Sequence, residues 1–224
     1  MKKILLIEDR EERQRLFSYK TKIDFDTYRD VLENKIGQDY QDFYELVKSD
    51  KFDFNEYRVV IAHKSAFNGD TQEVLYKIEK GCEENGVDLV LFSGGVTSNY
   101  YEESDSFKKL ELNSKDLYSV NLELFLENYI KNRTIELLIL SYGERWKLNI
   151  LLNSMEKINN FITSSVEDDI VYDEFVNATD FHLIETLEIE YLKPNIDDGW
   201  VYLWELKEMA LSIEKKIQER IIYE

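Results

Sequence analysis

The chain begins with a short apolar run that ends abruptly at two acidic residues. Residues 4–7 read Ile-Leu-Leu-Ile, and Glu8 and Asp9 follow them directly. A continuous apolar run bounded by charge is typical of a strand buried on both faces of a parallel sheet. Open α/β sheets bind their ligands at the carboxyl ends of such strands. We therefore expect an α/β fold that places Glu8 and Asp9 at the ligand-binding edge of its sheet.

Further strands and helices are expected to alternate through the first 130 residues. Strands are also predicted at residues 58–62, 89–92 and 110–112, and a candidate strand lies around residues 31–36. Apolar residues at helical spacing predict helices at 10–17, 40–47, 74–82 and 120–129. This alternation predicts a five-stranded parallel sheet with helices on both faces. The polar and acidic stretch between Val96 and Lys109 is expected to hold only a loop or a short helix.

The pattern becomes helical after residue 130. Apolar residues at helical spacing predict helices at 135–142, 146–161, 171–177, 181–191 and from residue 200 to the end of the chain. The clearest turn signal is the group Pro194, Asp197, Asp198 and Gly199. We therefore expect two domains, an α/β domain at 1–130 and an all-helical one at 131–224. Three tryptophans, Trp146, Trp200 and Trp204, are candidate interface anchors, with burial between the two domains as the alternative.

Charge and composition exclude several classes of partner. The net charge of −18 argues against nucleic-acid binding, which needs clustered Lys and Arg, and against anionic membrane surfaces. The sequence contains no run of 18 apolar residues, so we expect no membrane span. A cytoplasmic location is the default expectation, and the single Cys82 agrees with a reducing compartment. The excess of acid either serves solubility or forms an acidic face for a basic protein partner.

The acidic pair after the first strand resembles that of response-regulator receiver domains, in which the pair holds Mg²⁺. Ser93, at the end of the fourth predicted strand, matches the receiver hydroxyl that follows the phosphoryl group. Lys115 matches the receiver lysine after the fifth strand. The residue after that lysine is normally a cis-proline and is Asp116 here, so Asn113 or Ser114 are alternatives for the position. The resemblance covers about the first 130 residues and implies a flavodoxin-like, receiver-like fold.

The phosphoacceptor position departs from the receiver pattern. The third predicted strand ends in His63, where the resemblance requires an aspartate. With one carboxylate lost, Glu8, Asp9 and His63 would favour a softer divalent ion over Mg²⁺, which prefers oxygen ligands. The competing interpretation is a hydrogen-bonded structural histidine, with the acidic pair kept as a remnant or as a helix cap. We favour this second interpretation, so no cofactor is expected.

A second motif follows the fourth predicted strand. Residues Ser93, Gly94, Gly95, Val96, Thr97 and Ser98 are similar to the SGGxDS phosphate loop of PP-loop ATP pyrophosphatases. Such loops cradle phosphate with backbone N–H groups. Thr97 stands where that motif has its aspartate. The alternative is a tight turn that needs a positive φ at Gly94 or Gly95.

The resemblance implies a non-catalytic protein that acts by protein–protein interaction. We expect a regulatory or adaptor subunit of a bacterial signalling or defence assembly, with constitutive rather than phosphate-switched binding. The alternative is a nucleotide-binding sensor or enzyme that uses the loop Ser93 to Ser98 together with Glu8 and Asp9. A homodimer built by the C-terminal helices is a third expectation.

Overall fold

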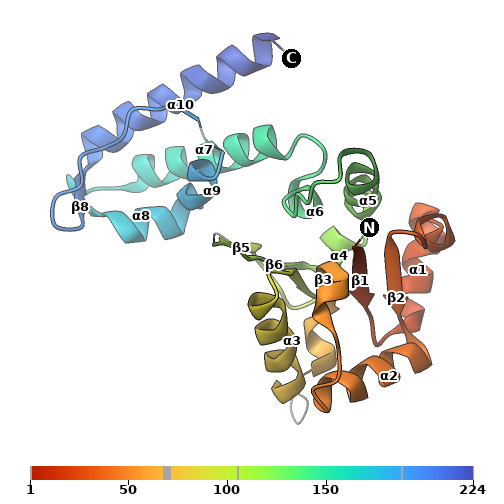
Figure 1. Cartoon of the computed structure of the whole chain (residues 1–224). Helices are drawn as coiled ribbons and strands as arrows, with labels where there is room; N and C mark the ends of the chain where they lie inside the picture. The colour runs from red at the N-terminus through yellow and green to blue at the C-terminus, as the bar shows by residue number, and fades with distance from the viewer. Residues whose placement is uncertain (1, 68–71, 105, 188, 224) are drawn as a thin grey trace. The chain divides into compact units, whose positions relative to one another are not determined.

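A computed structural model describes residues 2–67, 72–104, 106–187 and 189–223 of the chain (Figure 1). The chain divides into two compact units, residues 1–144 and 145–224, which are described separately below. The boundary lies after Glu144 rather than after residue 130, because the segment 131–144 packs with the first unit. One such contact is the hydrogen bond from the Asn121 amide to the Leu140 carbonyl at 3.1 Å.

The first unit is built on a mostly parallel sheet, as the alternation of strands and helices predicts. Its strands are β1 (Lys3–Ile7), β2 (Leu32–Lys35), β3 (Tyr57–His63), β4 (Asp88–Ser93), β5 (Tyr100–Glu103) and β6 (Lys108–Asn113). They lie in the order β2-β1-β3-β4-β6-β5, and all neighbours are parallel except β5 and β6. The α/β class is therefore confirmed, but the sheet has six strands rather than five.

The unexpected strand, β5, lies in the acidic stretch that was interpreted as a loop or short helix. Tyr101 is buried opposite Leu110, and the Glu103 carboxylate pairs with Lys108 at 2.7 Å. An edge strand needs only one inward side chain in each pair of residues, and charged residues protect such edges. The strand was missed because it has only four residues, of which one is buried and two are acidic.

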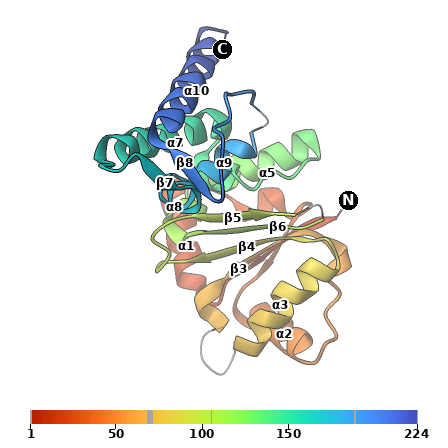
Figure 2. The ribbon, with the colours of Figure 1, turned by 90° about the vertical axis from the view of Figure 1, so that its left-hand side faces the viewer.

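Helices cover both faces of this sheet. The α-helices of the first unit are α1 (Glu11–Thr21), α2 (Gly37–Lys48), α3 (Gln72–Glu84), α4 (Ser114–Leu117), α5 (Val120–Asn132) and α6 (Ile139–Tyr142), and three 3₁₀ turns are η1 (Phe25–Tyr28), η2 (Phe54–Glu56) and η3 (Lys64–Phe67). Figure 2 shows α2 and α3 on one face and α5 on the other. Alternate residues of β1, such as Leu5 and Ile7, face the core under α2 and α3, which also holds Cys82. The two-sided burial explains why β1, β3 and β4 read as continuous apolar runs.

The second unit is mainly helical but also contains a small sheet. Its elements are α7 (Trp146–Ser164), β7 (Asp169–Val171), α8 (Tyr172–Thr179), α9 (Phe181–Glu185), β8 (Trp200–Tyr202) and α10 (Leu203–Tyr223). The antiparallel pair β7–β8 corrects the expectation of an all-helical region. Residues 200–202, predicted as the start of the last helix, are extended because the turn at Asp198 and Gly199 returns the chain onto β7. The helix at 181–191 ends early, at Glu185.

The tryptophans of the second unit differ in exposure. Trp200 and Trp204 are 49% and 56% exposed, so they are not buried core residues, and Trp146 is half-buried at the start of α7.

Within the described parts of the chain, no helix combines the length and apolar character needed to cross a membrane.

Candidate functional site

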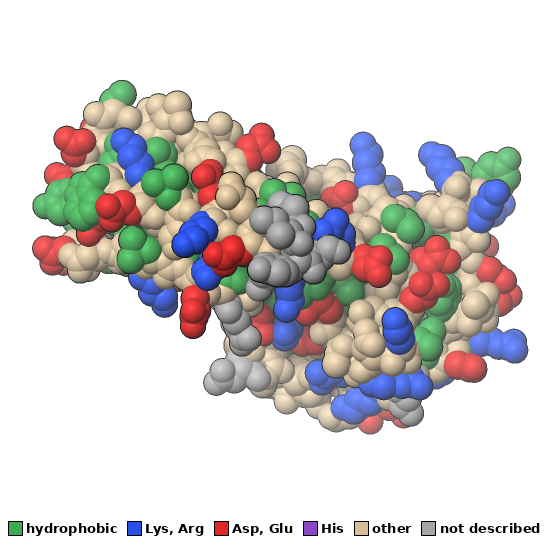
Figure 3. All heavy atoms as spheres, turned by 90° about the horizontal axis from the view of Figure 1, so that it is seen from above, with side chains coloured by type: hydrophobic (Ala, Val, Ile, Leu, Met, Phe, Trp, Pro, Cys, Tyr) green, Lys and Arg blue, Asp and Glu red, His purple; other side chains and the backbone are tan. Residues whose placement is uncertain are grey.

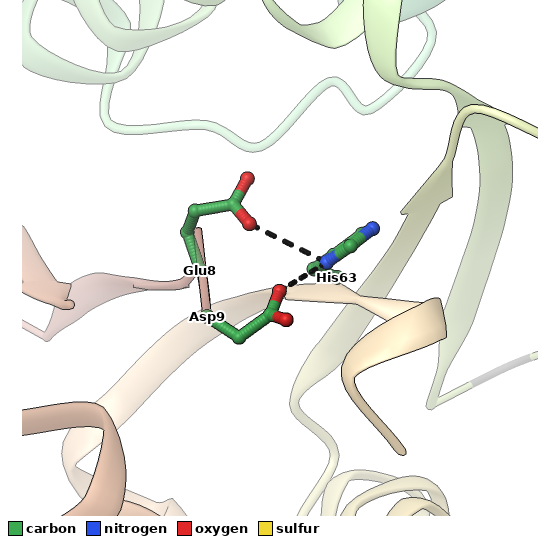
Figure 4. Close-up of side chains that lie close together, drawn as sticks. All are labelled: Glu8, Asp9 and His63. Atoms are coloured by element: carbon green, nitrogen blue, oxygen red, sulfur yellow. Dashed lines mark hydrogen bonds and ion pairs between the residues drawn. The ribbon is translucent and has the colours of Figure 1, made fainter. Parts of the chain in front are cut away.

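The carboxyl ends of β1 and β3 bring Glu8, Asp9 and His63 together. The two strands are parallel neighbours with Ile7 beside Ala62, so the residues that follow them meet at one edge of the sheet. One potential ligand atom from each of the three side chains lies within 4.8 Å of the others (Figure 4). Glu8 and His63 are fully buried, whereas the Asp9 side chain is 26% exposed. The structure thus assembles the acidic pair and the histidine that the sequence indicates.

Both ring nitrogens of His63 are engaged. Nδ1 forms a short hydrogen bond with the Asp9 carboxylate and lies 3.4 Å from Glu8 Oε1. Nε2 lies 2.9 Å from Nη1 of Arg13, a residue of α1. A guanidinium can only donate, so Nε2 is the acceptor and Nδ1 carries the proton. The ring is therefore a neutral imidazole that donates to Asp9 and accepts from Arg13.

The Glu8 carboxylate has its own set of donors. The Tyr118 hydroxyl donates to Oε2 at 2.9 Å, the Arg10 backbone N–H donates to Oε1 at 3.0 Å, and Arg13 Nη1 lies 3.7 Å from Oε2. Burial raises the pKa of Glu8, and the neighbouring donors and positive charge offset this only in part. Burial together with the Glu8 charge also raises the pKa of Tyr118, which keeps its hydroxyl protonated as a donor.

Asp9 is held in its charged form. Burial is the largest single influence and acts to raise the pKa of this carboxyl, but the interactions with His63 and Glu8 and a backbone hydrogen bond together outweigh it, so the pKa is lowered overall. The two adjacent acids are thus shifted in opposite directions by their surroundings. The partly exposed Asp9 supplies a stable negative charge. The buried Glu8 needs its hydrogen-bond donors to stay charged.

These residues do not fit a resident metal ion of the receiver kind. A metal on Nδ1 would need the lone pair of that nitrogen and would move the ring proton to Nε2, where an Arg13 N–H already points. Mg²⁺ also prefers oxygen ligands. The guanidinium of Arg13 already supplies positive charge beside Glu8. The geometry agrees with the hydrogen-bonded structural histidine and disfavours a divalent ion, hard or soft, in this arrangement.

Ser93 and Lys115, two residues suggested by the resemblance, lie apart from this network. The Ser93 hydroxyl forms a 2.7 Å hydrogen bond with the hydroxyl of Ser65. Lys115 lies in the short helix α4, and no hydrogen bond or ion pair among the described residues joins its ammonium to the acidic pair. The alternative Ser114 is buried and accepts from Arg13 Nη1 at 3.4 Å. Ser114, rather than Lys115, therefore reaches the cluster, and the described peptide bonds include no cis bond.

The loop after β4 does not have the features expected of a phosphate cradle. The Gly95 N–H donates to the Ser93 hydroxyl at 3.3 Å, and the Val96 N–H donates to the Ser93 carbonyl at 3.3 Å. Asn113 donates to the Val96 carbonyl at 2.7 Å, which ties the loop to the end of β6. The described glycines with positive φ do not include Gly94 or Gly95, so the prediction that this turn needs a positive φ is wrong. Thr97 and Ser98 follow in the same irregular segment.

An open groove of about 800 Å³ runs along the outer side of the site. It is formed by α1 and α4, and its lining includes Asp9, Arg13, Ser114 and Tyr118. Lys115 also lines this groove, together with the exposed Leu16. No residue of the loop 93–98 is among its lining residues. The network around His63 is therefore the inner wall of a surface groove.

Arg13 and Tyr118 complete the site, although the sequence patterns did not indicate either residue. Neither belongs to a motif, because their partners are 50 and 110 residues away in the chain. The only available signal for Arg13 is its place in the first turn of the helix after β1, which puts it over the end of the strand. Tyr118 carries no comparable signal.

No protein-family model, curated protein or solved structure matches the chain. The geometry of the site is therefore the basis for assigning a function.

Proposed function

We propose that the first unit is a degenerate receiver-type domain, and that the protein is a non-catalytic regulatory or adaptor subunit acting through protein–protein interaction. The observation that carries this proposal is the engagement of both His63 nitrogens inside a buried hydrogen-bonded cluster. A signalling or defence assembly is the setting that the resemblance suggests. The expected location is the cytoplasm.

The sheet supports the receiver-type interpretation. The five parallel strands lie in the order β2-β1-β3-β4-β6, which corresponds to the 2-1-3-4-5 order of flavodoxin-like doubly wound sheets. In such sheets ligands bind outside the carboxyl ends of the strands, where Glu8, Asp9 and His63 lie. The edge strand β5 is an addition to that arrangement.

The cluster lacks what a phosphate switch needs. Formation of an acyl phosphate requires a carboxylate at the end of β3, and His63 occupies that position. Phosphorylation of His63 itself would require a free ring lone pair. The lone pair of Nε2 accepts from Arg13, and the ring is fully buried. Arg13 instead supplies a permanent positive charge beside Glu8, so the domain is held in one state and binds its partner constitutively.

A nucleotide-binding function through residues 93–98 has less support. Two backbone N–H groups of that loop already donate to Ser93. A thermal-shift panel of nucleotides on the wild-type chain and the Gly94→Val variant tests this alternative. Stabilisation that is lost in the variant would favour it over the adaptor role.

Capture of the full chain from an extract of its native cells tests the proposal. The captured material is divided, and one half is incubated with Mg²⁺ and acetyl phosphate before native mass spectrometry. We expect one stoichiometric protein partner in both halves. A chain recovered alone in both halves, or a complex that forms or dissociates only with acetyl phosphate, would overturn the proposal.

A further inference from the structure

The small sheet of the second unit has one face in the core and one aromatic face in solvent. Ile170 of β7 and Val201 of β8 are buried at 8% and 2% exposure. Trp200 and Tyr202 are 49% and 52% exposed. Because side chains alternate along a strand, these two aromatic residues lie on the same, outward face. Among the described residues, neither ring contacts another aromatic ring or lies under a cation.

An acidic residue lies opposite each of the two aromatic residues, one across the β7–β8 ladder and one across the adjoining turn. Asp169 pairs with Tyr202 in the β7–β8 ladder, and Asp197 pairs with Trp200 in an isolated antiparallel bridge. Residues directly opposite each other in antiparallel strands project from the same face. The four residues Asp169, Asp197, Trp200 and Tyr202 therefore form one surface, called here the aromatic–acidic face.

A tight turn fixes one end of this face. Asp198 and Gly199 have φ angles of 49° and 82°, as in the two-residue type I′ turns that join antiparallel strands. The backbone groups of Asp197 and Trp200 exchange two hydrogen bonds of 2.9 Å across the turn. These backbone hydrogen bonds hold Asp197 and Trp200 side by side.

The face is hollowed, and its charge is of one sign. A surface pocket of about 400 Å³ is lined by Asp169, Asn195, Asp197, Asp198, Trp200, Val201 and Tyr202. Among these described lining residues there are three acids and no Lys or Arg. Figure 3 shows hydrophobic side chains gathered next to acidic ones at the left-hand end of the molecule, which is the end that carries β8 in Figure 1.

We propose that the aromatic–acidic face docks an arginine- or lysine-bearing segment of a protein partner. A guanidinium stacks on an indole or phenol ring while its N–H groups donate to a carboxylate, and this face offers both groups in neighbouring pairs. Exposed Trp and Tyr side chains are also typical anchors of protein interfaces. The inference deepens the proposed interaction function by naming the chemistry of the partner.

Charge argues against the other occupants of such a face. Nucleic acids and anionic membranes carry negative charge, which Asp169, Asp197 and Asp198 would repel. A second copy of the chain carries a net charge of −18 and would bring the same acids against themselves. A basic segment of another protein is the occupant that complements both the rings and the carboxylates.

Binding of a short arginine peptide to the full chain tests the proposal. The probe is a fluorescein-labelled peptide with three arginines separated by Gly and Ser, and fluorescence anisotropy reports its affinity. The Asp197→Asn/Asp198→Asn double variant is expected to bind about fivefold to tenfold more weakly, since charge-assisted bonds are lost. Asn tolerates the left-handed conformation of Asp198, so the turn is retained.

The matched control separates local recognition from general attraction to an acidic protein. The Glu83→Gln/Glu84→Gln variant changes the net charge equally, but at exposed positions of α3 in the first unit. We expect it to change the affinity by less than about twofold, because exposed charges that do not contact the peptide are largely screened by salt. Equal weakening by the two double variants would overturn the proposal, as would equal binding of a peptide with citrulline in place of arginine.

The aromatic half of the face has its own test. Trp200→Ala is expected to weaken peptide binding about threefold to tenfold, in the range of a cation–π contact, and Trp200→Phe less. Tyr76→Ala removes a 62% exposed ring from the first unit and is expected to change nothing. Circular dichroism checks that each variant is folded. If Trp200→Ala is folded and binds the peptide with unchanged affinity, the docking role is contradicted. A complex that depends on acetyl phosphate in the capture experiment would count only against the proposed constitutive function.

Discussion

Nη1 of Arg13 lies 2.9 Å from Nε2 of His63, and this contact fixes the tautomer of a buried imidazole. Because the guanidinium donates, the ring proton is on Nδ1 and points at the Asp9 carboxylate. The same cation lies 3.7 Å from the buried Glu8. One residue of α1 therefore contacts both the buried Glu8 and the neutral His63, which in turn donates to Asp9.

The first prediction concerns that tautomer. Long-range ¹H–¹⁵N spectra of the wild-type chain should show His63 as a neutral ring protonated at Nδ1 at about pH 7. In Arg13→Met, whose shorter side chain has no N–H donor, Nε2 loses its hydrogen bond, so its ¹⁵N chemical shift should move while the proton stays on Nδ1. The His182→Gln variant identifies the signals of the other histidine. A doubly protonated or Nε2–H ring in the wild type would contradict this account of the site.

The hydrogen bond from Tyr118 to Glu8 leads to a second prediction. Tyr118→Phe removes a donor from a fully buried carboxylate and should lower the free energy of unfolding by about 1–3 kcal/mol. The matched control is Tyr101→Phe, whose hydroxyl donates at 2.7 Å to the 39% exposed side chain of Glu103. Water can replace that donor, so the loss should be less than about 1 kcal/mol. Urea unfolding of both variants measures the difference. Equal losses of unfolding free energy would show that the buried Glu8 does not depend on the Tyr118 hydrogen bond.

The lowered pKa of Asp9 gives a third prediction, on pH dependence. A carboxyl with a depressed pKa in the folded state stabilises the fold above its unfolded pKa, and this contribution is lost as the pH falls through the folded value. Asp9→Asn should therefore be less stable than the wild type near neutral pH. The difference should shrink as the pH falls below the ordinary value of 3.8. Urea unfolding across the acid range measures it, and a difference that stays constant with pH would show that charge is not the cause.

The fourth prediction tests packing beneath α3. A Cβ at Gly81 would lie 2.6 Å from Cδ2 of the buried Phe54. Gly81→Ala should therefore cost about 1–3 kcal/mol of stability through overpacking, although Ala favours helices over Gly by about 1 kcal/mol. Gly94→Ala, where nothing lies within 4 Å, should have little effect. The cost at Gly81 should fall in a Phe54→Leu background, and a stabilising Gly81→Ala would contradict the close contact.

The sequence indicated the buried strands because burial on both faces leaves a continuous apolar run, as at Ile4–Ile7. It did not indicate β5, whose four residues carry one buried side chain, or β7 and β8, whose extended conformation depends on pairing rather than on local pattern. Glu8, Asp9 and His63 could be grouped because parallel strands end at one edge of the sheet. Arg13 and Tyr118 could not, since their roles depend on how α1 and α4 pack over that edge.

Intact-mass spectrometry after incubation with Mg²⁺ and acetyl phosphate tests the central claim most directly. The claim is that the cluster around His63 is a closed hydrogen-bonded network rather than a phosphate switch. A receiver protein of known activity in the same mixture serves as the positive control. We predict that the control gains a phosphoryl group and that this chain gains none. A phosphoryl group added to His63, or to either acid beside it, would contradict the account.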